Sequence, residues 1–369
     1  MRTAVLSDLH LGAGSDADLL RRPAFAERLL TALADVDRVV LLGDAVELRD
    51  RPLAEAIALA RPFFASLGRA VEEIVFVGGN HDHRLVEDWL EARAMDVGSE
   101  LELEQTFEAT GPLAVLAEAA GDARLVAAYP GVWLGSGVYA THGHFLDRHL
   151  TIPTFERLGV AAVERVLGIP PNGPDPLAPP DQSEVTSIEE YEKVQAPVYS
   201  FLYALAQAAG SRPPGGSPSA RMWRMLGGGQ TRTARLRGWL LGSVALPGAV
   251  GVANRLGLGP MRSDLTPGAI TRAGLDAIGQ VIARLAIPAE SVIFGHTHRR
   301  GPMDGESGWE SGRTRLWNTG NWVHAPALLR DTAPDSPYWP GTVAFVDAGG
   351  PPRLVHLLDD LSREQLATD

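Results

Sequence analysis

Five short clusters of aspartate, asparagine and histidine are spread along the chain, and each contains side chains that can bind a divalent metal ion. They are Asp8-Leu9-His10, Gly43-Asp44, Gly79-Asn80-His81-Asp82, His142-Gly143-His144 and Gly295-His296-Thr297-His298. Carboxylate, amide and imidazole groups are ligands that manganese, iron and zinc accept. A single aspartate or histidine after a strand is more often a helix cap or a satisfied polar residue. The whole ordered set indicates a metal site, because coincidence explains it poorly.

The segments before these clusters have the character of buried strands. The expected strands cover residues 3–7, 38–42, 73–77, 137–141 and 291–294. Between the first three, residues 24–34 and 53–67 carry apolar side chains at helical spacing, and a further helix is expected to begin near Leu85. Strands that alternate with helices predict a largely parallel sheet, in which the carboxyl ends of neighbouring strands face one crevice. The clusters are therefore expected to converge there.

The rest of the chain is divided by a change in composition. Residues 314–317, 341–347 and 353–358 are predicted to form strands of a second sheet that closes the fold. Between about His149 and Pro267, stretches rich in proline and glycine at 169–180 and 212–218 bracket a helical block at 188–209. We predict that this insertion is a helical cap over the site. The expected domains are a core from 1–148 and 268–369, with the cap at 149–267.

Composition limits the function. With 369 residues and 45% apolar content, the chain can bury a sizeable core. The absence of cysteine excludes disulfides, thiolate ligands and a cysteine nucleophile. A formal charge of −12 argues against nucleic acid as a partner and leaves a small phosphorylated substrate open. The start of the chain lacks the layout of a secretory signal, so we expect a cytoplasmic protein.

In order and spacing, the five clusters resemble the calcineurin-like metallophosphoesterase family. The resemblance implies a four-layer αββα fold, with two sheets packed face to face and helices outside. It also implies two metal ions. Asp8, His10, Asp44 and His298 would bind one ion, and the second ion would be held by Asp44, Asn80, His142 and His296.

Asp44 would bridge the two ions in this arrangement. Its carboxylate has two oxygens, and two-metal hydrolysis needs ions about 3.5–4 Å apart. Two cations that share a water lower its pKa enough to supply hydroxide near neutral pH, and they neutralise the charge that builds on the phosphoryl oxygens. We expect two divalent ions, manganese in preference to iron or zinc, and hydrolysis of a phosphate ester or pyrophosphate bond.

Further residues beside the clusters are candidates for catalysis and substrate binding. By the family pattern His81 does not bind metal, so we expect it to protonate the leaving oxygen, with Asp82 orienting its ring. His144 is expected to contact the phosphate or a metal ligand, and either His144 or His83 could equally be a surface residue. Four arginines next to the clusters have the planar fork that binds phosphate, although each could form a plain surface ion pair instead. They are Arg84, Arg148, Arg299 and Arg300.

The insertion also contains a mixed aromatic, cationic and apolar segment. Its anchors are Arg221, Trp223, Arg224, Arg232, Arg235, Arg237 and Trp239, followed by an apolar stretch at 240–253. Such a segment fits either cap helices that pack on the core or a surface for a membrane or acyl chain. It is too interrupted by glycine and proline to span a membrane.

The turn at Asn318-Thr319-Gly320-Asn321-Trp322 resembles the branch of the family that contains the UDP-2,3-diacylglucosamine diphosphatases. Those enzymes carry arginine where His81 stands and have a shorter insertion. Two other functions remain as alternatives. One is an inactive scaffold with the same fold, which usually lacks several ligands, and the other is a peripheral membrane protein that acts mainly through lipid contact.

Overall fold

The computed structural model describes residues 1–96, 100–135, 137–169, 186–210, 246–326, 328–329 and 335–367. The chain divides into two compact units. The first comprises Met1–His144, Leu202–Pro214 and Pro288–Asp369, and the second comprises Phe145–Phe201 and Gly215–Ile287. The metal-binding candidates all belong to the first unit, which therefore positions the site.

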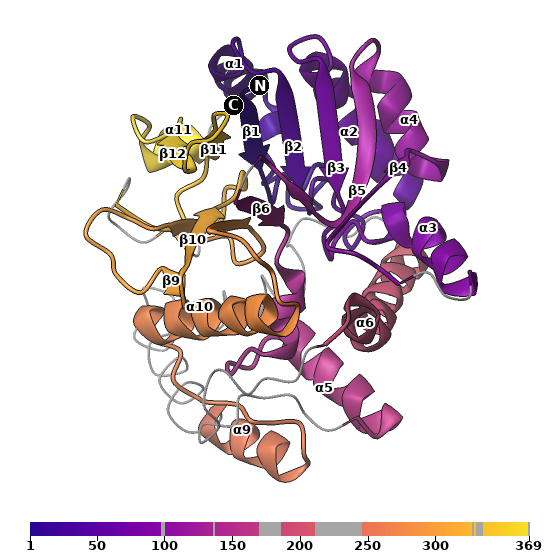
Figure 1. The fold of residues 1–369 in the computed structure, drawn as a ribbon, viewed down its shortest axis with the longest axis vertical. Helices are drawn as coiled ribbons and strands as arrows, with labels where there is room; N and C mark the ends of the chain where they lie inside the picture. Colours follow the sequence, from indigo (N-terminus) through magenta and orange to yellow (C-terminus); the bar gives the residue numbers. More distant parts are fainter. Residues whose placement is uncertain are drawn as a thin grey trace. The chain divides into compact units, whose positions relative to one another are not determined.

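The strands of the first unit form one hydrogen-bonded series (Figure 1). They are β1 (Thr3–Leu6), β2 (Arg38–Leu42), β3 (Glu73–Val77), β4 (Glu104–Glu108), β5 (Arg124–Trp133), β6 (Val138–Thr141), β7 (Ser291–Phe294), β8 (Arg300–Gly301), β9 (Glu310–Ser311), β10 (Thr314–Thr319), β11 (Thr342–Val346) and β12 (Arg353–His356). Their order is β12-β11-β1-β2-β3-β5-β6-β7-β10-β8, with β4 on β5 and β9 on β10.

The long strand β5 joins two halves of this series. Its first part pairs in parallel with β3, and its last residues, Gly131 to Trp133, pair antiparallel with β6. Strands β1, β2 and β3 are parallel to one another, as are β6, β7 and β10. The parallel sheet predicted for the first part of the chain is confirmed, and the carboxyl ends of these strands carry the predicted site residues.

One part of the expected strand arrangement is wrong. The segments at 341–347 and 353–358 were expected to form a second sheet together with 314–317. Instead, β11 pairs antiparallel with β1 and β12 pairs with β11, so both strands extend the first half, whereas β10 pairs with β7 in the other half. The segments at 137–141 and 291–294, which continued the pattern of the first strands, pair with each other in the β10 half. Local periodicity identifies a strand but does not select its partner.

The helices of the first unit follow the apolar periodicity of the sequence. They are α1 (Pro23–Ala32), α2 (Leu53–Leu67), α3 (Arg84–Met95), α4 (Gly111–Ala120) and α11 (Arg363–Ala367), with a short 3-10 helix η1 (Leu19–Arg21). The buried residues of α2, among them Ala56, Ala60, Phe63 and Leu67, recur at helical spacing, and the helix packs against α4. The predictions of helices at 24–34, at 53–67 and from about Leu85 are confirmed.

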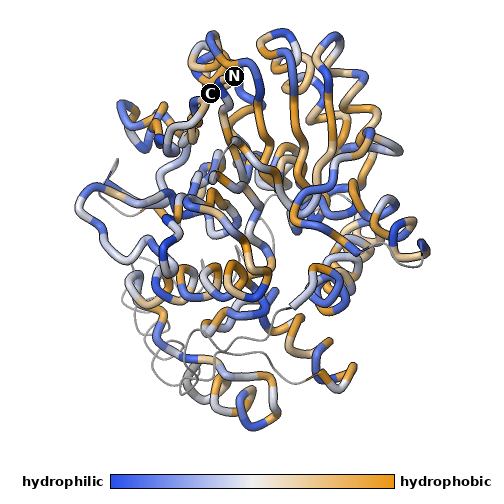
Figure 2. The backbone as a smooth tube through the Cα atoms, in the orientation of Figure 1, coloured by the Kyte–Doolittle hydropathy of each residue, from blue (hydrophilic) through white to orange (hydrophobic). Residues whose placement is uncertain are grey.

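Apolar side chains of both halves of the strand series form one hydrophobic cluster. It includes Val40 and Val75 on one side of β5 and Val138 and Ile293 on the other. The strands are the most continuously apolar parts of the first unit (Figure 2). This shared core is what the expected face-to-face packing requires, and the four-layer arrangement itself stays a prediction.

The second unit is helical in its described part. It contains most of η2 (His144–Arg148), α5 (Phe155–Leu167), the first part of α6 (Ile188–Ala209), α9 (Leu246–Arg255) and α10 (Pro267–Arg284). The hydroxyl of Thr154 caps α5 by accepting from the backbone N–H of Arg157, and Gly168 ends the helix in the left-handed conformation. The predicted block at 188–209 is α6, whereas the cap over the site stays a prediction.

Most of the candidate lipid surface lies outside the described residues. Residues 221–239, with all the predicted aromatic and cationic anchors, lie outside the described residues, as does the apolar stretch as far as 245. Among the helices that the structure describes, none is both long and apolar enough to cross a bilayer.

Candidate metal centre

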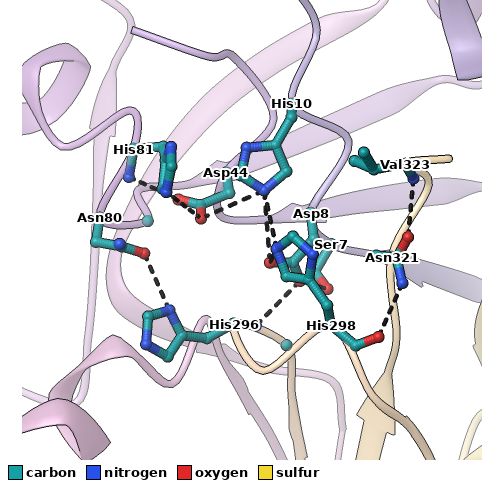
Figure 3. Close-up of polar contacts among 12 residues, drawn as sticks. Ser7, Asp8, His10, Asp44, Asn80, His81, His296, His298, Asn321 and Val323 are labelled. Atoms are coloured by element: carbon teal, nitrogen blue, oxygen red, sulfur yellow. Dashed lines mark hydrogen bonds and ion pairs between the residues drawn. The ribbon is translucent and has the colours of Figure 1, made fainter. Parts of the chain in front are cut away.

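The site is built where neighbouring strands of the first unit end (Figure 3). Asp8 follows β1, Asp44 follows β2 and Asn80 follows β3, whereas His142 follows β6 and His296 follows β7. All five side chains are buried or partly buried. The structure therefore brings together the ends of strands from both halves of the series, as the sequence predicted.

Strained backbone marks the same positions. Among the described residues, seven that are not glycine have positive φ, and five of these are predicted ligands. The five are Asp8, His10, Asp44, His296 and His298, with φ between 46° and 66°. The left-handed region is costly for residues with a Cβ, and such strain concentrates at functional sites, where the surroundings enforce it. The clustering of five such residues at the strand ends thus supports a functional site there.

Glycine is required beside the ligands because other parts of the site approach the backbone closely. A Cβ on Gly43 would lie 2.3 Å from Cγ of the His142 ring, and φ at Gly43 is +79°. A Cβ on Gly295 would lie 2.2 Å from Oγ of Ser7 and 2.5 Å from Oδ2 of Asp8. The glycines that precede Asp44 and His296 therefore allow the strand ends to pack together.

The first group that can hold an ion consists of Asp8, His10 and His298. Nε2 of His10 and Nε2 of His298 lie 3.1 Å apart, and Oδ1 of Asp8 lies 3.3 Å from Nε2 of His298. Oδ1 of Asp8 is buried and accepts no hydrogen bond among the described residues. A buried carboxylate oxygen normally has a partner, so this atom fits a role as a cation ligand.

The second group consists of Asp44, His142 and His296, with Asn80 beside them. Oδ1 of Asn80 lies 3.1 Å from Nε2 of His142 and 3.0 Å from Nδ1 of His296. Nδ1 of His142 lies 2.9 Å from the carbonyl of Leu42 and must donate to it, so Nε2 of the neutral ring carries a lone pair. Nε2 of His142, Nδ1 of His296, the amide of Asn80 and the carboxylate of Asp44 therefore converge on one point, and this donor set also fits a metal.

The two groups meet at Asp44. Oδ2 of Asp44 lies 3.4 Å from Nε2 of His142 and 3.8 Å from Nε2 of His10. Oδ1 of the same carboxylate accepts from the backbone N–H of His81 at 2.7 Å, which fixes the orientation of the carboxylate. One carboxylate therefore faces both groups of nitrogen ligands.

The electrostatics of the site favour positive charge. Burial raises the pKa of Asp8 and of Asp44, but the imidazoles around them outweigh burial and hold both pKa values below the ordinary value. Burial lowers the pKa of His10 and His142, but the surrounding carboxylates, Glu47 and Asp44 first among them, raise each to about 9. These shifts have one cause, which is that the carboxylates stabilise positive charge where the imidazole nitrogens meet. Metal cations supply the same charge.

Glu47 is a buried residue of the site that sequence reasoning missed. Its Oε2 lies 3.0 Å from Nδ1 of His10 and 2.8 Å from Nδ1 of His81, and its Oε1 accepts from the backbone N–H of Arg49. Both rings must donate to this carboxylate when their Nδ1 is protonated, which turns their Nε2 atoms toward Asp44. The signal in the sequence was an ionisable residue three positions after Asp44, at the edge of the site.

Asp82 does not orient His81, contrary to the role expected from the sequence. Its Oδ2 accepts from the backbone N–H groups of Ala45 and Val46, and its Oδ1 accepts from that of Gly79. Asp82 is fully buried, and burial and the charge of Asp44 raise its pKa to about 6. Both carboxylate oxygens accept hydrogen bonds from the two loops that carry Asp44 and Asn80, so Asp82 holds those loops together.

The position of His81 fits two roles. Its Nε2 lies 4.0 Å from Oδ2 of Asp44, and His10, Asp44 and His81 form a third group that could hold an ion. His81 is also the most exposed of these three side chains, with 17% of its side-chain surface exposed. A partly exposed imidazole with one nitrogen bound to a carboxylate is suited to proton transfer.

Two asparagines support the loop with the last two histidines. Nδ2 of Asn318 donates to the carbonyl of Gly295 at 3.0 Å, and Nδ2 of Asn321 donates to the carbonyl of His298 at 2.8 Å. Ser7 links Thr319 to Asp8 through its hydroxyl. The turn at 318–322 therefore holds the loop that carries His296 and His298 in place.

The candidate substrate-binding residues have partners in the structure. Arg84 pairs with Glu87 and Asp88 on its own helix. Arg299 pairs with Glu306, and its guanidinium lies 5.1 Å from the centroid of Trp309. Both arginines therefore form the ion pairs that were the alternative to substrate contact.

The other candidates beside the clusters, His83, His144, Arg148 and Arg300, are buried. Nε2 of His144 lies 3.2 Å from the hydroxyl of Tyr129, and burial, together with the charge of His142, holds the pKa of His144 well below its ordinary value. His83 is buried as well, so neither histidine is a surface residue. Arg300 pairs with Asp359 in the first unit, and Arg148 pairs with Glu164 in the second.

Of the comparisons with known proteins, the match to a family model agrees with this site. Residues 1–176 match the family model described as calcineurin-like phosphoesterase. A similar solved structure is the phosphopantetheinyl hydrolase PptH from Mycobacterium tuberculosis, which is 12% identical over 90% of this chain and 93% of that chain, with a TM-score of 0.29. A search of curated proteins finds no match. The family match covers the strand ends from Asp8 to His142, and together with the Asp and His groups it supports a metal-dependent phosphoesterase.

Proposed function

We propose that this protein hydrolyses a phosphate ester or pyrophosphate bond with two metal ions. The observation that carries the proposal is the position of Asp44, whose Oδ2 faces Nε2 of His142 at 3.4 Å and Nε2 of His10 at 3.8 Å. A carboxylate between two sets of ligands is what a pair of adjacent ions requires. Asp8, His10 and His298 would hold one ion, Asn80, His142 and His296 the other, and Asp44 would contact both.

The ions, when bound, would activate a water for attack and neutralise charge on the phosphoryl oxygens. Nitrogen and oxygen ligands in this mixture suit manganese, iron or zinc, and we propose manganese first. The chain itself supplies the rigidity of the site, because Glu47, Asp82 and the turn at 318–322 hold the ligands or their loops.

His81 is proposed to donate a proton to the leaving oxygen. Its Nδ1 is held by the carboxylate of Glu47 at 2.8 Å, and its Nε2 is directed toward the side of the site where Asp44 lies. A carboxylate on one nitrogen stabilises the protonated ring and fixes which nitrogen can deliver the proton. Glu47, rather than Asp82, is the positioning residue for this acid.

The proposed ligands define the class of substrate, which is a phosphate ester or a pyrophosphate. Phosphomonoesters, phosphodiesters and pyrophosphates can all use the same ligands, and a nucleotide- or lipid-linked substrate remains among them. The resemblance of the 318–322 turn to the diacylglucosamine diphosphatases adds a lipid-linked pyrophosphate to the substrates worth testing. That turn contacts the ligand loop through Asn318 and Asn321, so it supports the metal site more directly than a substrate.

The test is a screen of mono-, di- and pyrophosphate substrates with manganese, zinc or iron added, beside metal analysis of the purified protein. We expect wild-type protein to bind two ions and to turn over at least one substrate class, and Asp44→Asn to lose turnover and bound metal. Full activity in Asp44→Asn would contradict the proposal. Metal binding without any turnover would favour the inactive scaffold, and liposome binding without turnover would favour the peripheral membrane protein.

A further inference from the structure

Arg49 lies directly behind the proposed ligand Asn80. Its side chain is buried, and its Nη2 donates to the main-chain carbonyl of Asn80 at 2.7 Å. Its own backbone N–H donates to Oε1 of Glu47 at 2.8 Å. A guanidinium is a permanent cation with donors only, so its position beside a metal ligand influences which atom of that ligand faces the metal.

The side-chain amide of Asn80 can occupy this place in two orientations that differ by a half-turn. In what we call the cation-facing orientation, shown in Figure 3, Oδ1 lies 3.1 Å from Nε2 of His142 and 3.0 Å from Nδ1 of His296. Nδ2 is then 3.2 Å from Nη1 and Nη2 of Arg49, so donors face donors. This orientation suits a site in which a cation attracts the oxygen.

The opposite, Arg49-facing orientation satisfies the amide without a cation. Oδ1 then accepts from Nη1 and Nη2 of Arg49 at 3.2 Å each. Nδ2 is placed to donate to Oδ2 of Asp44 at 3.2 Å, to Nε2 of His142 at 3.1 Å or to Nδ1 of His296 at 3.0 Å. Oδ1 thus gains two donors, and Nδ2 gains the carboxylate of Asp44, so the oxygen and the nitrogen of the amide each have a partner of the correct kind.

We propose that Arg49 competes with the metal ion for Oδ1 of Asn80, and that ion binding at the Asp44, Asn80, His142 and His296 group turns this amide over. The proposal rests on the proposed function, because it concerns the affinity of that same site. Arg49 thereby weakens ion binding at the Asn80 group and leaves the group of Asp8, His10 and His298 unaffected by this competition. Arg49 is a positioning residue that sets how readily one of the two ions leaves.

Two simpler roles for Arg49 predict different outcomes. If Arg49 only holds the main chain of Asn80 in place, its removal weakens ion binding. If Arg49 acts only through its charge, its removal strengthens ion binding to the same extent whether or not Asn80 is present. A proton on Nε2 of His142 could also satisfy Oδ1 in the cation-facing orientation, and then Arg49 would not compete for that oxygen. The sign of the effect and its dependence on Asn80 therefore separate the roles.

The test is a double-mutant cycle measured by calorimetric titration of metal-free protein with Mn²⁺. The four proteins are wild type, Arg49→Met, Asn80→Ala and the double variant, and His296→Ala identifies the binding step of the Asn80 group. Hydrogen bonds from a charged donor contribute about 1.5–3 kcal/mol, so we expect Arg49→Met to tighten that step about tenfold or more. In the Asn80→Ala background the same substitution should tighten it much less.

An unchanged or weaker step in Arg49→Met overturns the inference, and so does an equal tightening in both backgrounds. Failure of the proposed function is a different result, namely no binding of Mn²⁺ by wild-type protein at the step that His296→Ala identifies. The two failures are thus distinguishable from one titration series.

A second measurement needs no variant of Arg49, whose removal from a buried position could prevent folding. In wild-type protein with labelled asparagine, the Asn80 amide is assigned by its loss in Asn80→Asp. In metal-free protein we expect nuclear Overhauser contacts from its amide protons to the His142 and His296 rings. These contacts should disappear when diamagnetic Zn²⁺ is added. Contacts that are the same in both states would refute the turning of the amide.

Discussion

Glu47→Gln is the substitution that most directly tests how this site is held. The two imidazole contacts, from His10 and His81, both use Oε2, whereas Oε1 accepts from the backbone N–H of Arg49. A glutamine has one oxygen and one NH2 group. If its oxygen faces the two rings, its NH2 faces the N–H of Arg49, and if the amide turns, its NH2 faces both rings. Neither orientation retains all the contacts.

The size of the effect follows from these contacts. Burial lowers the pKa of His10, but the carboxylates around it, Glu47 first among them, outweigh burial and keep the ring protonated. Burial raises the pKa of Glu47, but the charges of His81 and His10 outweigh burial and hold this pKa below its ordinary value. Residues that orient metal ligands typically contribute about 10- to 100-fold in metal affinity or activity. We therefore expect kcat/KM of Glu47→Gln to fall about 10- to 100-fold, which corresponds to about 1.4–2.7 kcal/mol.

The assay measures kcat/KM on the best substrate of the screen at saturating Mn²⁺, with metal content measured in parallel. His81→Ala provides the matched background, because in it Glu47 has lost one imidazole contact and keeps those with His10 and the backbone of Arg49. The loss caused by Glu47→Gln should be smaller there than in wild type. Activity and metal content within twofold of wild type in Glu47→Gln would refute the reasoning, and so would an equal loss in both backgrounds.

Three further predictions follow from other contacts. His81→Ala should keep both ions and lose most of the rate, as measured by metal analysis and turnover, because the ring is placed to transfer a proton; loss of metal would instead make His81 a ligand. Asp82→Asn should lower the melting temperature and metal content together, because the carboxylate accepts three backbone N–H bonds from the two ligand loops; unaltered melting would contradict that role. Burial raises the pKa of Glu306, but its bond with Arg299 outweighs burial and holds the pKa below the ordinary 4.5. The ionised Glu306 therefore stabilises the folded state above that pH, and this contribution is lost as the pH falls through the folded-state pKa. Glu306→Gln should therefore lower the melting temperature at pH 7 and converge with wild type near the acid limit, and a constant difference at all pH values would refute it.

Much of the fold was predictable because its elements carry strong local patterns. Buried strands are short apolar runs, and α2 and α6 occur at the residues that the helical spacing indicated. The partners of β11 and β12 were not predictable. They are apolar runs like the others, and whether such a run joins β1 or β10 depends on contacts far apart in sequence.

For the site, the ligand types were predictable from the sequence, whereas the contacts between side chains were not. The ligand types follow from the sequence because few residues bind divalent metals and because they occur after strands. The partner of His81 was assigned wrongly, since Asp82 is adjacent in sequence whereas Glu47 lies 34 positions away. Adjacency in a chain says little about side-chain contact when the backbone turns as sharply as it does around this loop.

The amino-acid sequence by itself determined that the protein is an α/β protein with oxygen- and nitrogen-bearing side chains able to hold metal at its strand ends, since residue type and period carry that information. Only the tertiary structure decided which carboxylate holds which imidazole, how β5 joins the two halves, and that Arg49 stands behind Asn80. Hydrogen bonds act over about 3 Å in space, and no spacing along the chain encodes that distance.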